Sequence, residues 1–309
     1  MSSPNGTQNG RAGVIGLGAM GLGMATSLVR AGFEVAGYDI ASAAVDRLMA
    51  AGGQGAASPA QAATGADIIV SVVVNAAQTE AALFGPEGCA AAMPEGAVFV
   101  SCATMAPDAA RALASRLEST GRHYLDAPIS GGAKRAAEGA LTILTSGRPA
   151  AYDKARPALA AMAQTVHELG SEPGVAAAFK MVNQLLAGVH IAAACEAITF
   201  AARQGLDIGK VYEVITQAAG NSWMFENRIP HVLDGDYTPL SAVNIFTKDL
   251  GIVMDMGRTA NFPVPMAATA LQLFTMTSAA GMGRDDDASV ARFYAQTAGV
   301  TLPKGKRED

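Results

Sequence analysis

A glycine-rich turn near the start of the chain constrains the fold more than any other feature. Residues 12–15 form a short apolar run, and Gly16-Leu17-Gly18-Ala19-Met20-Gly21 follows it and opens a helical pattern. Glycines at these spacings allow a tight turn, close approach of the backbone to a pyrophosphate, and packing of the helix on the strand. The helix N-terminus adds amide donors and a positive dipole end. The pattern therefore predicts a dinucleotide-binding unit whose cofactor contacts are Gly16, Leu17, Gly18, Ala19, Met20 and Gly21.

Asp39 indicates which dinucleotide this turn receives. It ends the next predicted strand, 34–38, and lies 18 residues after Gly21. A carboxylate at that point accepts hydrogen bonds from the ribose hydroxyls of NAD and repels the 2'-phosphate of NADP. Because Ile40 follows and no arginine lies next to Asp39, we expect NAD as the cofactor. The alternative is a glycine-rich turn with an unrelated surface aspartate.

The remaining pattern predicts two domains. Short β-rich runs alternate with alanine-rich helical patterns at 12–15, 34–38, 67–74, 97–101, 122–126, 140–145 and 164–168. Such alternation is typical of an α/β fold with a doubly wound, mostly parallel Rossmann sheet. After Pro173 only helical patterns follow, at 175–204, 207–219, 241–260, 264–280 and 286–298. We therefore expect a disordered tail over 1–10, an NAD-binding Rossmann domain over 11–172 and an all-helical substrate and oligomerisation domain over 173–309.

Charge and composition exclude several classes of protein. The net charge of −5, without a general basic field, argues against nucleic acid as a partner. Cys89, Cys102 and Cys195 are widely spaced and form no disulfide or metal pattern, so we expect no metal and a reducing compartment. The first ten residues lack the pattern of a signal peptide, and the apolar run 68–74 is too short to span a bilayer. These features predict a cytoplasmic protein that does not bind membranes.

The helix that begins near 175 carries the first candidate for chemistry. Lys180 lies among apolar neighbours, with Asn183 and Gln184 on its own helix face. Burial in such surroundings lowers the pKa of a lysine toward the range in which the amine exchanges protons at neutral pH. The alternative is a surface lysine whose ammonium group extends into water, which is the commoner meaning of a lone lysine on a helix.

A loop after the predicted strand 122–126 offers groups that can hold a carboxylate. The sequence Asp126-Ala127-Pro128-Ile129-Ser130-Gly131-Gly132 follows that strand at the carboxyl edge of the sheet, where open α/β sheets bind ligands. Ser130 and the amides of Gly131 and Gly132 are its candidate substrate contacts. The alternative is an ordinary loop rich in proline and glycine.

Two later segments contain further polar groups. Residues 220–228 are expected to join two helical segments, and their side chains, including Asn221 and Ser222, can line the far wall of a pocket. Lys248, followed by Asp249, can reach the substrate carboxylate or the cofactor. The structural alternatives are a core anchor at the tryptophan within 220–228 and a solvated ion pair in the helix over 241–260.

Together these motifs resemble the β-hydroxyacid dehydrogenase family, 3-hydroxyisobutyrate dehydrogenase and its relatives, from Gly13 to about Thr301. The turn at 16–21 is similar to the family's dinucleotide fingerprint, 126–132 to its substrate loop and 174–184 to its catalytic helix. The resemblance implies that Lys180 is the general acid/base, that Ser130, Gly131 and Gly132 grip the substrate carboxylate, and that Lys248 closes over the cofactor. It also implies cofactor contacts by Val73, Val74, Gln78 and Thr104 around the nicotinamide half.

The resemblance has consequences for assembly as well. It implies a homodimer or homotetramer supported by the helical domain, and an active site in the cleft between the two domains. The helix over 175–204 is apolar beyond one core face, which also favours a subunit interface.

One position departs from the family pattern. The family usually has asparagine four residues after the catalytic lysine, whereas this chain has Gln184 there and Asn183 before it. Gln184 and the segments 220–228 and 234–239 resemble a subgroup that oxidises the C2 hydroxyl of a four-carbon sugar acid with NAD. Hydrogen-bonding groups at Asn183, Gln184, Asn221 and Ser222 suit such a substrate, because an unpaired buried amide costs about 1 to 3 kcal/mol.

Several alternatives share the same residues. Within the family they are a reductase of tartronate semialdehyde or succinic semialdehyde, and a 3-hydroxyisobutyrate dehydrogenase. Outside the enzymes, the alternative is a nucleotide-binding interaction module. The presence of Lys180 favours an enzyme over that module.

Overall fold

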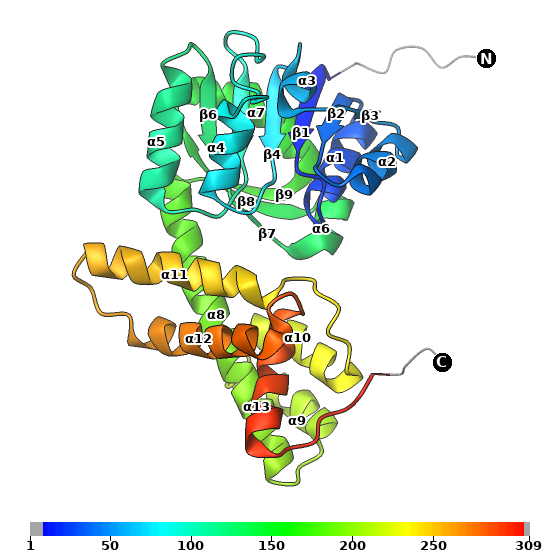
Figure 1. Cartoon of the computed structure of the whole chain (residues 1–309), viewed down its shortest axis with the longest axis vertical. Helices are drawn as coiled ribbons and strands as arrows, with labels where there is room; N and C mark the ends of the chain where they lie inside the picture. Colours follow the sequence, from blue (N-terminus) through cyan, green and yellow to red (C-terminus); the bar gives the residue numbers. More distant parts are fainter. Residues whose placement is uncertain (1–8, 306–309) are drawn as a thin grey trace. The chain divides into compact units, whose positions relative to one another are not determined.

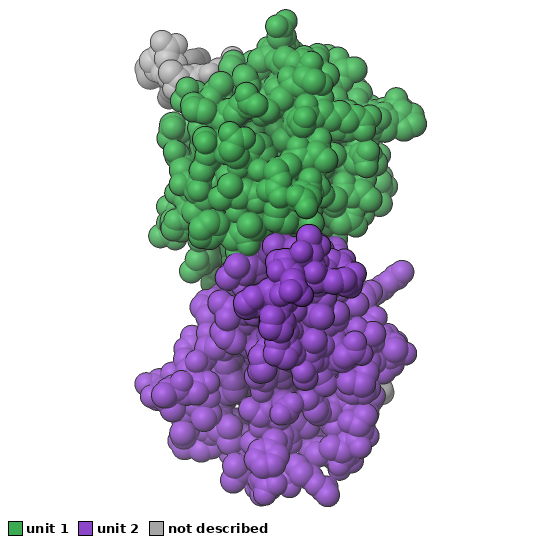
Figure 2. Space-filling model, turned by 90° about the vertical axis from the view of Figure 1, so that its left-hand side faces the viewer, with its two compact units in different colours: residues 1–180 green, residues 181–309 purple. Residues whose placement is uncertain are grey.

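The computed structural model describes residues 9–305, which fold into two compact units. Unit 1 is Met1–Lys180 and unit 2 is Met181–Asp309, coloured green and purple in Figure 2. The division falls inside one continuous helix, α8, Val175–Arg203. Residues 1–8 of the tail expected over 1–10 lie outside the described residues.

Unit 1 contains a nine-stranded, mostly parallel sheet (Figure 1). Its strands are β1 Arg11–Ile15, β2 Glu34–Tyr38, β3 Gln54–Gly55, β4 Ile68–Ser71, β5 Val98–Ser101, β6 His123–Asp126, β7 Ile129–Ser130, β8 Leu141–Gly147 and β9 Ala163–Glu168. The order is β3-β2-β1-β4-β5-β6-β8-β7, with β9 paired to β8. The strands from β3 to β6 are parallel, and β8 runs antiparallel to both β6 and β7. The predicted mostly parallel Rossmann sheet is confirmed.

Helices cover both faces of this sheet. They are α1 Gly21–Arg30, α2 Ser42–Ala50, α3 Pro59–Ala63, α4 Ala76–Phe84, α5 Pro107–Glu118, α6 Gly132–Glu138 and α7 Pro149–Met162. Alternate residues of a strand face opposite sides, so Val70, Val100 and Leu125 pack with α1, α6 and α7. Their neighbours, including Phe99 and Tyr124, pack with α4 and α5. Two apolar layers therefore cover the two faces of the sheet.

Unit 2, together with the start of α8, is helical, as predicted. Its further helices are α9 Ile208–Ile215, α10 Trp223–Asp234, α11 Val243–Thr259, α12 Pro265–Thr277 and α13 Val290–Ala298, with a π-helical turn at Ser278–Met282 and a 3-10 turn at Asp287–Ser289. The buried side of α8 packs against Phe225, Phe246 and Phe274 of three of these helices. Among the described residues, α8 is the helix long and apolar enough to cross a membrane, and half of its most apolar stretch is buried in the protein.

The expectation for residues 220–228 was wrong. They do not simply join two helices, because α10 begins at Trp223. The Ser222 hydroxyl caps this helix by accepting a hydrogen bond from the Phe225 amide at 3.0 Å. Phe225, Ile229 and Val232 are buried at helical spacing, and polar residues between them obscure that pattern in the sequence.

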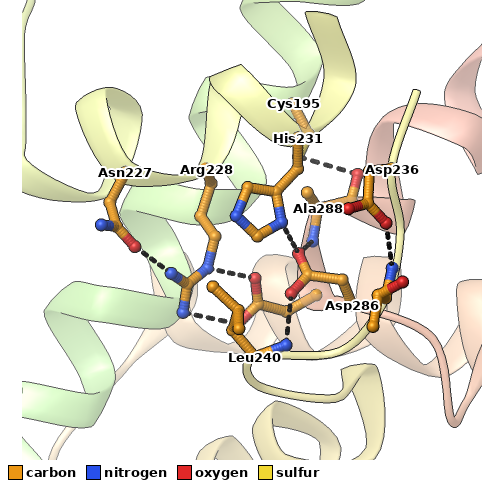
Figure 3. A network of polar contacts seen from close by, with 10 residues as sticks. Cys195, Asn227, Arg228, His231, Asp236, Leu240, Asp286 and Ala288 are labelled. Carbon is orange, nitrogen blue, oxygen red and sulfur yellow. Dashed lines mark hydrogen bonds and ion pairs between the residues drawn. The ribbon is translucent and has the colours of Figure 1, made fainter. Parts of the chain in front are cut away.

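A buried ion-pair network joins α10 to the residues before α11 and α13 (Figure 3). The Arg228 guanidinium donates to Asp287 through Nε at 2.6 Å and Nη2 at 3.2 Å. His231 Nδ1 lies 3.1 Å from Asp286 Oδ1, and the second oxygen of Asp286 accepts from the Leu240 amide. Both aspartates are fully buried. The network thereby fixes the connection that leads into α11.

Titration should affect this network. The hydrogen bond to Asp286 raises the pKa of His231 above its ordinary value, against the effect of burial. Burial raises the pKa of Asp287 to about 6, although Arg228 opposes the change. A histidine whose pKa is higher in the folded state contributes to stability. This contribution is fully present at pH values below the unfolded-state pKa of about 6.5, and it is lost as the pH rises through the folded-state pKa.

We expect His231→Asn to lower the free energy of unfolding by about 1.5 to 3 kcal/mol at pH 6, because a hydrogen bond to a charged group is lost. At pH 9 the loss should be smaller, because the wild-type imidazole is then neutral. Urea denaturation of both proteins at the two pH values measures the difference. His167→Asn, at an exposed position in unit 1, is the control. Equal losses at pH 6 and pH 9 would contradict a contribution from the charged pair.

Candidate active site

The glycine-rich turn has the shape that a pyrophosphate requires. Gly16 has φ +91°, and a Cβ added there would lie 2.7 Å from the Val72 carbonyl oxygen. A Cβ at Gly21 would lie 1.9 Å from the Gly16 oxygen. At Gly18, by contrast, an added Cβ would meet nothing within 4 Å. The first and third glycines thus close the turn, and the second leaves its backbone open beside the start of α1, as expected for a dinucleotide.

Asp39 holds this turn in place. Its Oδ2 accepts a hydrogen bond from the Leu17 amide at 2.6 Å, and its Oδ1 accepts one from the Ala41 amide at 2.8 Å. Each carboxylate oxygen has a second lone pair for a ligand hydroxyl. Asp39 therefore has a structural role that the sequence pattern did not indicate, in addition to the predicted ribose contact.

A cavity of about 360 Å³ lies beside the turn in unit 1. Its lining includes Tyr38 and Ile40, on either side of Asp39, together with Val73 and Gln78. Gln78 is oriented by accepting a hydrogen bond from the Val74 amide at 2.8 Å. The structure thus brings two of the predicted cofactor residues to the end of β2. Thr104, another predicted cofactor residue, lies half-buried in the connection between β5 and α5.

Lys180 lies in the second turn of α8 and is 7% exposed. Its Nζ donates a hydrogen bond to the Ile129 carbonyl at 3.0 Å. Ile129 directly precedes Ser130, so the carbonyl that accepts from the lysine amine is next in sequence to a predicted carboxylate contact. The alternative of a surface lysine extending into water does not hold.

The loop 126–132 is divided in its roles. Asp126 points into the protein, where its Oδ2 accepts hydrogen bonds from the amides of Gly174 and Ala177 at 3.0 and 2.8 Å. Burial raises the pKa of this carboxyl to about 6, although these hydrogen bonds oppose the change. Ser130 is half-buried in β7, and Gly131 and Gly132 follow with positive φ at the start of α6. Only the second half of the loop is available to a substrate.

In unit 2, a chain of polar contacts links α8 to α11. Asn183 Nδ2 donates to Gln184 Oε1 at 2.9 Å, and Gln184 Nε2 donates to Asp249 Oδ2 at 2.5 Å. The other oxygen of Asp249 lies 2.5 Å from Lys248 Nζ. Because a carboxylate only accepts, Asp249 determines which way the Gln184 amide points. Asp249 is 1% exposed, so the alternative of a solvated pair at 248–249 does not hold.

Asn221 and Ser222 have local partners in the connection between α9 and α10. Asn221 Nδ2 donates to the Thr216 carbonyl at 3.2 Å and also contacts Glu226. The Ser222 hydroxyl caps α10. These hydrogen bonds join Asn221 and Ser222 to residues between 216 and 226. Residues 9–305 contain no group of three or more His, Cys, Asp or Glu side chains that could hold a metal ion.

Sequence comparisons place these features in a known family. The model described as "NAD binding domain of 6-phosphogluconate dehydrogenase" matches residues 11–170. The model described as "NAD-binding of NADP-dependent 3-hydroxyisobutyrate dehydrogenase" matches residues 174–294. The chain thus contains an NAD(P)-binding domain followed by a second domain typical of these dehydrogenases.

Individual relatives match this chain over almost their full length. The chain is 52% identical to L-threonate dehydrogenase of Cupriavidus necator, over 96% of this chain and 98% of that protein. It is 33% identical to 2-(hydroxymethyl)glutarate dehydrogenase of Eubacterium barkeri, over 95% and 98%.

A solved structure shows the same arrangement of elements. The crystal structure of 3-hydroxyisobutyrate dehydrogenase from Salmonella typhimurium matches with a TM-score of 0.89 and 45% identity, covering 92% of this chain and all of that one. The predicted resemblance and enzyme class are confirmed. The chain belongs to the 3-hydroxyisobutyrate dehydrogenase family of NAD(P)-dependent hydroxyacid dehydrogenases.

Proposed function

We propose that this enzyme oxidises the C2 hydroxyl of L-threonate to 2-dehydro-L-erythronate with NAD. The observation that carries the proposal is the buried amine of Lys180, held 3.0 Å from the Ile129 carbonyl beside Ser130. The name of the Cupriavidus necator relative supports the four-carbon substrate. The polar chain from Asn183 to Asp249 supports it as well, because these groups suit a substrate with several hydroxyls.

Lys180 acts as the general acid/base in this proposal. The dinucleotide, when bound, supplies the acceptor for the hydride from C2. Neutral Lys180 Nζ accepts the proton of the C2 hydroxyl, and the ammonium form returns that proton in the reverse direction. Both forms of the amine carry N–H groups, so the Ile129 carbonyl can hold Nζ in place in either state.

The remaining site residues bind and orient. Ser130, with the amides of Gly131 and Gly132, would hold the substrate carboxylate. Asn183 and Gln184 would meet its hydroxyls, with Asp249 fixing the amide of Gln184. Asn221 and Ser222 complete the proposed substrate set.

We place the cofactor on the turn from Gly16 to Gly21. Asp39 would accept the ribose hydroxyls, and its negative charge favours NAD over NADP. Val73 and Gln78 share a cavity with the neighbours of Asp39, so we assign them to the adenosine half instead of the nicotinamide half. Val74, Thr104 and Lys248 remain proposed cofactor contacts.

We further propose a cytoplasmic homodimer or homotetramer whose functional domains are 11–172 and 173–309. The outer side of α8 supports the assembly, because Phe179, Val182 and Phe200 are each more than half exposed on it. A second copy of the chain would remove these large apolar side chains from water.

The substrate is tested by NADH absorbance with hydroxy acids of three to five carbons, including both enantiomers of threonate. We expect L-threonate to be oxidised. Reduction of semialdehydes without oxidation of any sugar acid would overturn the proposed substrate.

The role of Lys180 is tested by substitution. We expect Lys180→Ala to retain NAD affinity while its turnover falls by about two to four powers of ten. Lys210→Ala, which replaces an exposed lysine paired with Glu213, is the matched control. Near-normal turnover of Lys180→Ala would overturn the proposed role.

The cofactor is tested by fluorescence titration with NADH and NADPH. Asp39→Ala should weaken NADH binding by about 10- to 100-fold, because hydrogen bonds to a charged group are lost and the turn is loosened at Leu17. NADPH binding should suffer less, because the repulsion of the 2'-phosphate disappears with the carboxylate. A preference of the wild-type enzyme for NADPH would contradict the assignment.

Asp249 is tested by denaturation and kinetics. Asp249→Ala should lower the free energy of unfolding by about 1 to 3 kcal/mol, because it removes the buried hydrogen-bond acceptor of Gln184 and the partner of the half-buried Lys248. It should also raise the KM for the sugar acid, since Gln184 loses its orientation. Asp255→Ala on the same helix breaks an exposed pair with Arg258 and should cost less than about 1 kcal/mol. Similar effects of the two substitutions would argue against a role for Asp249 in the site.

A further inference from the structure

The first turn of α8 is capped by a side chain from the sheet. Helix N-caps usually come from the residue just before the helix. Here Asp126, the last residue of β6, supplies one carboxylate oxygen to the amides of Gly174 and Ala177, which lie 48 and 51 residues later in the chain. Asp126 is fully buried, so a substrate cannot reach it without displacing the helix.

Ser146 on β8 supports the same turn. It is paired in register with Asp126, and its hydroxyl accepts a hydrogen bond from the Ala176 amide at 2.9 Å. The same hydroxyl lies 3.4 Å from Asp126 Oδ2 and donates to it. Two strands thereby satisfy three amide donors at the start of α8, a region in which a helix otherwise leaves its amides unpaired.

Gly174 lets the helix start come this close to its neighbours. Its φ is +92°, and a Cβ added there would lie 2.8 Å from the Pro107 carbonyl oxygen. Any other residue would be strained and would push the first turn away from α5. The position of the turn is therefore set by backbone contact as well as by Asp126.

The loop that starts at Asp126 also contacts α8 a second time. Three residues after Asp126, the Ile129 carbonyl accepts the hydrogen bond from Lys180 Nζ. Ile129 is paired in register with Ile143 of β8, the strand that also carries Ser146. One end of the loop thus holds the backbone of Ala177, and the other holds the side chain three residues further along the helix.

We propose that Asp126 is a positioning residue for the reaction, fixing the first turns of α8 so that Lys180 Nζ stays at the Ile129 carbonyl beside Ser130. This inference rests on the proposed role of Lys180. It separates Asp126 from the substrate contacts of its own loop, with which the resemblance had grouped it. Loss of the contact would let the helix start shift, and small displacements of a reacting group cost large factors in rate.

The test compares Asp126→Asn, Asp126→Ala and Ser146→Ala with the wild-type enzyme at a temperature well below unfolding. Asn keeps the size and one acceptor oxygen but loses the charge, so we expect a fall in kcat of about 10-fold. For Asp126→Ala we expect a fall on the order of 100-fold. Ser146→Ala should have a smaller effect, and it supplies a folded variant if Asp126→Ala does not fold. NADH affinity should be unchanged in all folded variants.

Asp207 provides the matched control. Its carboxylate oxygen caps α9 in the same manner, accepting from the amides of Gly209 and Lys210 at 2.9 and 3.3 Å. Helix α9 carries none of the proposed site residues. Asp207→Ala should therefore lower stability through loss of a cap and leave kcat unchanged.

Two readouts do not require the substrate. Hydrogen exchange measured by mass spectrometry should show faster exchange in the peptide covering 174–182 of Asp126→Asn, with the other peptides unchanged. Labelling by acetic anhydride should modify Lys180 faster in that variant than in the wild type. If the wild-type enzyme oxidises no hydroxy acid, the proposed function fails, and these two measurements still decide the inference.

Normal kcat in Asp126→Asn, together with unchanged exchange and labelling, would overturn the inference. It would also be overturned if the loss of kcat matched that of Asp207→Ala, or if it were accompanied by an equal loss of NADH affinity. The second result would assign Asp126 to stability, and the third would assign it to cofactor binding.

Discussion

The hydrogen bond from Lys180 Nζ to the Ile129 carbonyl is the interaction on which the proposed chemistry depends. An amine removed from water needs a partner, because an unpaired buried polar group is costly. One partner here is a backbone carbonyl, which accepts from the amine but carries no charge. It can therefore orient the nitrogen without competing for the proton, whereas a carboxylate in its place would form an ion pair that strongly favours the ammonium form.

Asp39 links the glycine-rich turn to the proposed ribose contact. The same carboxylate that is proposed to accept the ribose hydroxyls also accepts from the Leu17 amide in the glycine-rich turn. A substitution chosen to change the preference between NAD and NADP will therefore also disturb the turn proposed to hold the pyrophosphate. Changes of cofactor specificity in this enzyme need a replacement that still accepts from Leu17, which a neutral side chain with an oxygen can do and a longer basic one cannot.

Much of the fold followed from the sequence, because periodicity and glycine spacing report local structure directly. The strands β1, β2, β6 and the helix α8 were predicted within one or two residues. The short strands β3 and β7 were not predicted, because two residues give no periodic pattern. Strands this short form only where they can pair with a neighbouring strand. The start of α10 was missed because its buried residues are separated by polar ones. Lys180 was found as a candidate, but its hydrogen bond to Ile129 depends on tertiary structure, and so does the capping of α8 by Asp126.

The substitution of Gln184 for the family asparagine follows a simple physical rule. Glutamine has one more methylene than asparagine, so its side-chain amide lies one bond further from the helix. In a buried position the amide nitrogen then needs a hydrogen-bond acceptor at that new place. Asp249 on α11 meets that need at 2.5 Å, and the amide oxygen then accepts from Asn183. Asn183 Oδ1 is thereby left as an acceptor while its nitrogen is engaged with Gln184. The hydrogen-bonding character of this part of the site is thus determined by Asp249, which does not itself need to touch the substrate, and a relative that keeps asparagine at this position would need a different partner for the aspartate.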